Sequence, residues 1–142
     1  MPIFRTFRIP RARERVRIII NCLSSGILDI YDRIFELSDW TLKQEVMFGL
    51  SNIACHSEQI NDHFVKHDVF TTVQRQLVSS DLNLRREAIF TVGNALITMD
   101  IVKLHHMVIK GTIDIHGYLK GLTVMTSYDL LLSILQTIEL FI

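Results

Sequence analysis

The chain contains two segments, forty-two residues apart, with nearly the same sequence: LKQEVMFGLSN at 42–52 and LRREAIFTVGN at 84–94. When the longer ranges 26–56 and 68–98 are aligned without a gap, seven of thirty-one positions are identical. The identical pairs are Arg33/Arg75, Ser38/Ser80, Asp39/Asp81, Leu42/Leu84, Glu45/Glu87, Phe48/Phe90 and Asn52/Asn94. A Glu, an aromatic residue and an Asn therefore recur at fixed offsets, which indicates that the chain folds as an array of similar units.

The repeated unit is predicted to be helical. Apolar residues recur at intervals of three and four with no persistent strand alternation, and proline occurs only at positions 2 and 10. Within one unit we expect helices at about 57–66, 69–79 and 83–97. Helical repeats of this length are typical of armadillo and HEAT-like solenoids. We therefore predict an all-α, armadillo-repeat, right-handed superhelical solenoid of about three repeats.

The domain organisation follows from the same pattern. A basic N-terminal arm, 1–12, is expected to precede one armadillo-repeat domain, 13–142, with repeats at about 13–56, 57–98 and 99–142. Gly26, Asp68 and Gly111 are expected to start the second helix of each repeat. Asp39 and Asp81 stand ahead of the long helices, where a carboxylate can cap free backbone amides. The final helix, Tyr128 to Ile142, keeps the apolar rhythm without the repeated Glu, aromatic and Asn residues.

The amino-acid composition constrains the function less than the repeat pattern does. Lys and Arg together number 15, as do Asp and Glu, so net charge suggests neither nucleic acid nor an acidic partner. The arginines crowd the first seventeen residues, at positions 5, 8, 11, 13, 15 and 17. They indicate either a solvated, partly disordered arm or a basic segment resembling an internal ligand. Cys22 and Cys55 fit reduced thiols, and no apolar run is long enough for a membrane span. These features favour a soluble intracellular protein.

The long helices are expected to have two different faces. Their core stripes are Leu42, Val46, Leu50 and Ile53 in one repeat, and Leu84, Ala88, Val92 and Ala95 in the next. The second face comprises Glu45, Phe48, Asn52 and Cys55, then Glu87, Phe90, Asn94 and Ile97. Stacked repeats would align the aromatic and Asn residues as ladders along a groove. In one repeat alone, the Phe could be a core residue and the Asn an ordinary exposed helix residue. The repetition of the whole set in two repeats favours a binding face.

This face suits an extended basic peptide. An Asn amide donates and accepts hydrogen bonds, so it can hold a peptide's backbone N–H and C=O groups. An aromatic ring one turn earlier can contact the aliphatic stem of Lys or Arg and attract its charge. Glu45 and Glu87 would add the opposite charge.

The segments EVMFGLSN and EAIFTVGN resemble the third helix of the armadillo repeats in the importin-α family of nuclear-import adaptors. There the pattern is typically Glu, then Trp three residues on, then Asn four further. SEQINDHFVKHDVF also resembles the junction between the first and second helices of those repeats, and LLLSILQTIELFI resembles their less regular late repeats. The resemblance covers about residues 14–142 and best matches the C-terminal half of that domain, near the minor site for nuclear localisation signals.

The resemblance implies a peptide-binding site at Glu45, Phe48, Ser51, Asn52, Glu87, Phe90 and Asn94. It implies an adaptor that binds basic nuclear-localisation-signal peptides or cargo proteins, in cytoplasm and nucleus, with an export receptor as a further partner at the late repeats. The chain departs from the pattern because both Trp positions are Phe and the third repeat has Leu140 or Ile138 where Asn is expected. It also lacks an importin-β-binding segment and the earlier repeats, so it looks like a shortened or partial importin-α. The alternative is an armadillo scaffold with a decayed groove that acts in protein–protein interaction or self-association.

Other chemistry finds little support. His63, His67 and the pair His105–His106 lack the further ligands of a zinc motif, and no nucleophile–base arrangement or phosphate-binding loop is recognisable. We therefore expect no enzyme activity, cofactor, metal, nucleic acid or membrane partner. The apolar final helix predicts exposed hydrophobic surface and self-association, with a homodimer as the simplest closed state.

Overall fold

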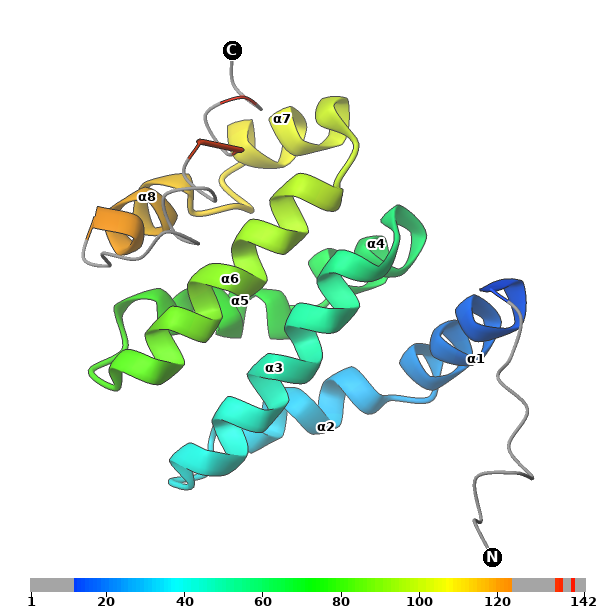
Figure 1. The fold of residues 1–142 in the computed structure, drawn as a ribbon, viewed down its shortest axis with the longest axis horizontal. Coiled ribbons are helices and arrows are strands. Elements are labelled where there is room, and N and C mark those ends of the chain that lie inside the picture. The colour runs from blue at the N-terminus through cyan, green and yellow to red at the C-terminus, as the bar shows by residue number, and fades with distance from the viewer. Residues whose placement is uncertain (1–11, 124–134, 137–138, 140–142) are drawn as a thin grey trace, which may run out of the picture.

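The computed structural model describes residues 12–123, 135–136 and 139, and this part of the chain contains helices and no strand (Figure 1). The all-α prediction is therefore confirmed for these residues. The elements are α1 (Ala12–Ser24), α2 (Ile27–Ile34), α3 (Trp40–His56), α4 (Glu58–Lys66), α5 (Asp68–Arg75), the short 3₁₀ helix η2 (Gln76–Val78), α6 (Leu82–Thr98), α7 (Ile101–Ile109) and α8 (Ile115–Thr123).

The three helices expected within one unit are confirmed by α4, by α5 with η2, and by α6. The boundaries follow from local hydrogen bonding at each helix start. The Ser57 hydroxyl accepts a hydrogen bond from the Ile60 amide at 3.3 Å at the start of α4. His67 Nδ1 accepts one from the Val69 amide at 3.0 Å at the start of α5. Such side-chain acceptors satisfy amides that have no partner within the helix.

The expected aspartate caps are also confirmed. Asp39 Oδ1 accepts a hydrogen bond from the Leu42 amide at 3.0 Å, and Asp81 Oδ1 accepts one from the Leu84 amide at 2.8 Å. Asp81 Oδ1 additionally accepts a hydrogen bond of 3.4 Å from the Gln44 side chain. The second cap therefore also connects α6 to α3.

Replacing Asp81 with alanine should lower the free energy of unfolding by about 1 kcal/mol, because it removes the cap of α6. Asp81→Asn should cost less, since its amide oxygen can still accept the hydrogen bond from the Leu84 amide. Urea denaturation of both variants checks this. Equal losses for Ala and Asn would show that the cap does not contribute in this way.

Two glycines have positive φ angles, 93° at Gly26 and 74° at Gly111. Gly26 is the N-cap of α2, as expected. The expectation for Gly111 is wrong: its amide donates to the Val108 carbonyl at 3.0 Å, so it closes α7. The second helix of this unit, α8, begins four residues later at Ile115, where the Asp114 carboxylate accepts a hydrogen bond from the Gly117 amide at 2.8 Å. A left-handed glycine at the end of a helix is a common stop signal.

The first six helices form two triplets in which each helix contacts its counterpart. α1 contacts α4, α2 contacts α5, and α3 contacts α6, the last being the most extensive pair. Figure 1 shows α3 and α6 running side by side across the molecule. Polar pairs support this stacking: His67 Nε2 lies 2.9 Å from Asp29 Oδ1, and the Thr72 hydroxyl donates to Asp32 Oδ1 at 2.5 Å.

The hydrophobic core runs through both triplets and continues into α7 and α8. It differs from the prediction on one helix. All four predicted core residues of α6 are buried. On α3 the buried residues are Val46, Met47, Leu50 and Ala54, whereas Leu42 is 38% exposed and Ile53 is half-buried. The stripe differs because α3 packs against both α4 and α6, so that Met47 and Ala54 are also enclosed. The first turn of α3, which includes Leu42, remains accessible.

Some expectations concern residues outside the described part of the chain. These are the arm up to residue 11 and most of the final helix expected from Tyr128 to Ile142, including Ile138 and Leu140. The prediction of self-association through that helix therefore stays a prediction. No helix among the described residues is both long and apolar enough to cross a membrane.

Candidate functional site

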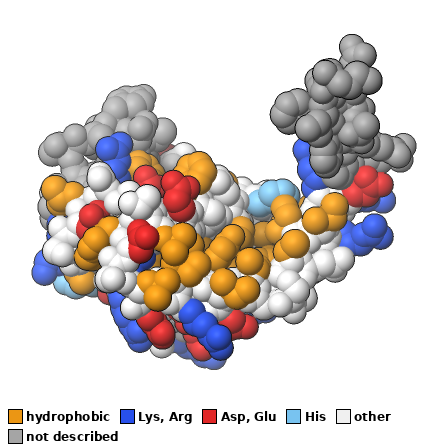
Figure 2. Space-filling view, turned by 90° about the horizontal axis from the view of Figure 1, so that it is seen from below, with side chains coloured by type: hydrophobic (Ala, Val, Ile, Leu, Met, Phe, Trp, Pro, Cys, Tyr) orange, Lys and Arg blue, Asp and Glu red, His pale blue; other side chains and the backbone are white. Residues whose placement is uncertain are grey.

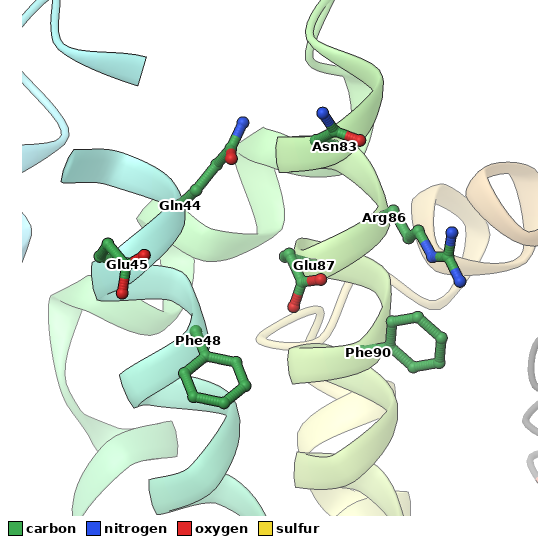
Figure 3. A pocket seen from close by; sticks show the side chains of 7 residues that line it. All are labelled: Gln44, Glu45, Phe48, Asn83, Arg86, Glu87 and Phe90. Atoms are coloured by element: carbon green, nitrogen blue, oxygen red, sulfur yellow. The ribbon is translucent and has the colours of Figure 1, made fainter. Parts of the chain in front are cut away.

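A groove of about 530 Å³ lies between the outer faces of α3 and α6. Figure 3 shows the side chains that line it: Gln44, Glu45 and Phe48 from α3, and Asn83, Arg86, Glu87 and Phe90 from α6. Four of the seven predicted site residues, the two Glu and two Phe residues, therefore meet at one surface. The parallel packing of α3 and α6 brings the repeated positions together.

Both aromatic rings of the groove are accessible. Phe48 is 58% exposed and Phe90 is half-buried. Neighbouring residues on each helix, such as Met47 and Ile89, are fully buried, so the helices pack in the core without either ring. In Figure 3 the Phe48 ring lies on the side of α3 that faces α6, whereas Phe90 lies on the side of α6 away from α3. Each ring can therefore offer an apolar surface to a ligand.

The groove also contains two carboxylates. Glu45 is exposed and Glu87 is half-buried. Among the described residues, ion pairs join Lys66 and Lys103 to Asp62, and His67 contacts Asp29; none of these involves Glu45, Glu87 or Arg86. The two glutamate charges are thus not compensated by a bonded cation in this part of the structure, and they favour a positively charged ligand.

The two predicted asparagines differ in their bonding. The Asn94 amide donates to Ser51 Oγ at 2.9 Å and, more weakly, to the Ser51 carbonyl at 3.4 Å. Asn52 is exposed, and its side chain has no hydrogen-bond partner among the described residues. Ser51, itself a predicted site residue, therefore holds Asn94 in place. In the absence of a ligand Asn52 is free to donate and accept, whereas the amide nitrogen of Asn94 is already engaged by Ser51.

The sequence prediction missed three residues that line the groove: Gln44, Asn83 and Arg86. Arg86 has a specific contact, since its guanidinium carbon lies 5.8 Å from the centre of the Phe90 ring. The spacing from residue 86 to residue 90 is one helical turn, at which side chains on a helix are neighbours. That spacing could have revealed the contact from the sequence.

The histidines and cysteines have no metal-binding arrangement in the described part of the chain. No group of three His, Cys, Asp or Glu side chains there could hold an ion. His67 accepts a hydrogen bond from Val69 at Nδ1, which leaves the proton at Nε2 to be donated to Asp29. Cys22 and Cys55 are exposed free thiols.

Hydrophobic side chains are also exposed beyond the groove. Figure 2 shows hydrophobic side chains gathered across one face of the molecule, with acidic and basic side chains above and below them. Large exposed examples among the described residues include Ile30, Leu37, Val78, Leu82, Val102 and Ile109. Apolar surface is thus available to a protein partner outside the groove.

No protein family, curated protein or solved structure matches this chain.

Proposed function

We propose that the chain is an importin-α-like adaptor module that binds extended basic peptides of the nuclear-localisation type. The observation that supports this most is the convergence of Glu45, Phe48, Glu87 and Phe90 at one groove. Counterpart helices of the two triplets contact one another. This stacking supports an armadillo-type solenoid in which α3 and α6 form part of a concave binding surface.

The side-chain chemistry of the groove selects for cations. The exposed face of Phe48 can contact the aliphatic stem of a Lys or Arg and attract its charge. Glu45 and Glu87 lie nearby without a cationic partner among the described residues. Ring and carboxylates together therefore favour a basic side chain over an acidic or purely apolar one.

The asparagines supply contacts to the peptide backbone. Asn52 and Asn94 lie one helical turn beyond Phe48 and Phe90 on the two parallel helices. Each amide could hydrogen-bond to an extended backbone that crosses α3 and then α6. Since few repeats supply few pockets and Phe is a weaker cation–π partner than Trp, we expect micromolar or weaker affinity. The module would act in nuclear protein import by holding cargo through such segments.

Neutralising both groove carboxylates, Glu45→Gln with Glu87→Gln, should weaken binding of a lysine-rich peptide by about two- to thirtyfold at low salt, because each exposed charge pair contributes roughly 0.2–1 kcal/mol. Fluorescence anisotropy of a labelled peptide at several salt concentrations measures the effect. The variant should also show a shallower salt dependence, because fewer charge pairs are screened.

The matched control is Glu36→Gln with Asp68→Asn, which removes two exposed charges outside the groove. If this control weakened binding equally, net charge rather than the groove would explain the effect. If the unmodified chain failed to bind any lysine-rich peptide, the proposed function would be refuted.

A protein-interaction scaffold is the second candidate. The observations that favour it are that Ser51 already holds Asn94, and that Arg86 already lies over Phe90 in the groove. Absence of peptide binding combined with self-association in analytical ultracentrifugation would support this candidate instead.

A further inference from the structure

The two halves of the groove differ at the residue one turn before each aromatic ring. Phe48 and Phe90 occupy equivalent positions of the repeat, but Gln44 precedes the first and Arg86 precedes the second. Arg86 places its guanidinium carbon 5.8 Å from the centre of the Phe90 ring. Figure 3 shows both side chains on the same side of α6.

This contact changes what the second half of the groove can accept. A cation is attracted to the face of an aromatic ring, and the chain itself already places the Arg86 cation over Phe90. A second positive side chain would have to displace Arg86 from that face, and elsewhere around the ring it would be repelled by the Arg86 charge. Among the described residues, Arg86 has no ion pair with a carboxylate that would draw it from the ring.

The first half of the groove has no such occupant. Gln44 is neutral, and its amide nitrogen donates to Asp81 Oδ1 at 3.4 Å. In Figure 3 its side chain extends away from Phe48. The Phe48 ring, more than half exposed, is therefore open to a cation from outside.

We propose that Arg86 is a specificity-determining residue. It lets the groove accept one cationic side chain, at Phe48, and excludes a second at Phe90. This inference rests on the proposed function and narrows its ligand to extended peptides with an isolated Lys or Arg, rather than a continuous basic run.

The test uses extended peptides in which lysine is the only charged residue. One peptide carries a single lysine, and the others carry a second lysine two, three or four residues from the first. They are titrated against the unmodified chain, Arg86→Gln and Gln44→Arg. The second lysine should improve affinity less than twofold for the unmodified chain. In Arg86→Gln it should improve affinity about two- to fivefold at its best spacing, as expected for a surface cation–π contact. Gln44→Arg should weaken the single-lysine peptide by a similar factor.

The control is Arg33→Gln, which makes the same charge change at an exposed position of α2 outside the groove. If the second lysine improved peptide affinity as much in Arg33→Gln as in Arg86→Gln, net charge would explain the effect and the inference would be overturned. An equal gain already present in the unmodified chain would also overturn it and leave the proposed function standing. If no peptide bound to the unmodified chain or to any variant, both the inference about Arg86 and the proposed function would be refuted.

Discussion

Replacing Asn52 and Asn94 together with alanine should weaken the binding of a basic peptide about tenfold or more. Each amide is proposed to hydrogen-bond to the peptide backbone, and one such bond contributes roughly 0.5–1.5 kcal/mol. Isothermal titration calorimetry or fluorescence anisotropy measures the change. Because backbone contacts are independent of peptide side chains, the loss should be similar for peptides with one or several lysines.

The single variants should not be equal. Asn94 already donates to Ser51 Oγ at 2.9 Å, so a ligand gains less by exchanging this bond than by satisfying Asn52. Asn52→Ala should therefore cause the larger share of the loss. Asn21→Ala, at an exposed position of α1, is the control and should leave affinity unchanged. An unaltered titration of the double variant would refute the role assigned to both amides.

Replacing Phe64 with alanine should lower the free energy of unfolding by about 3–5 kcal/mol. Phe64 is fully buried, and its ring meets the Phe70 ring edge to face, with centroids 5.3 Å apart and an interplanar angle of 80°. The substitution removes this contact and leaves a cavity between α4, α5 and the rest of the core. Urea denaturation followed by circular dichroism measures the loss. Phe64→Leu should lose less free energy of unfolding, and it can be measured if the alanine variant does not fold.

The same substitution at Phe48 is the matched control. Phe48 is exposed in the groove, so Phe48→Ala should change the free energy of unfolding by no more than about 0.5 kcal/mol while weakening peptide binding. Comparable destabilisation by the two alanine variants would mean that Phe48 has a structural role and would contradict its assignment to the binding face.

The sequence by itself determined the helices from Glu58 to Thr98 and their boundaries, but it placed the start of α8 at Gly111 instead of Ile115. Helix periodicity and capping depend on residues three and four apart, so Asp39, Ser57 and Asp81 mark helix starts whatever the chain packs against. The repeat also identified Phe48 and Phe90 as residues off the core stripe. Residues forty-two positions apart occupy equivalent places in two repeats, so they have similar surroundings. Core packing alone tolerates substitution and does not require a Glu, an aromatic residue and an Asn to recur together, which indicates that these residues lie off the core.

Only the tertiary structure decided how the repeats differ. Met47 and Ala54 are buried because α3 contacts both α4 and α6, which helical periodicity alone does not specify. Position 51 is Ser and its equivalent 93 is Gly. A Cβ at Gly93 would lie 2.8 Å from the hydroxyl of Tyr118 on α8, whereas Ser51 lies beside α6 and bonds to Asn94. The chain's repeats are similar in sequence because each forms the same helices, and they differ in chemistry because each meets a different neighbour.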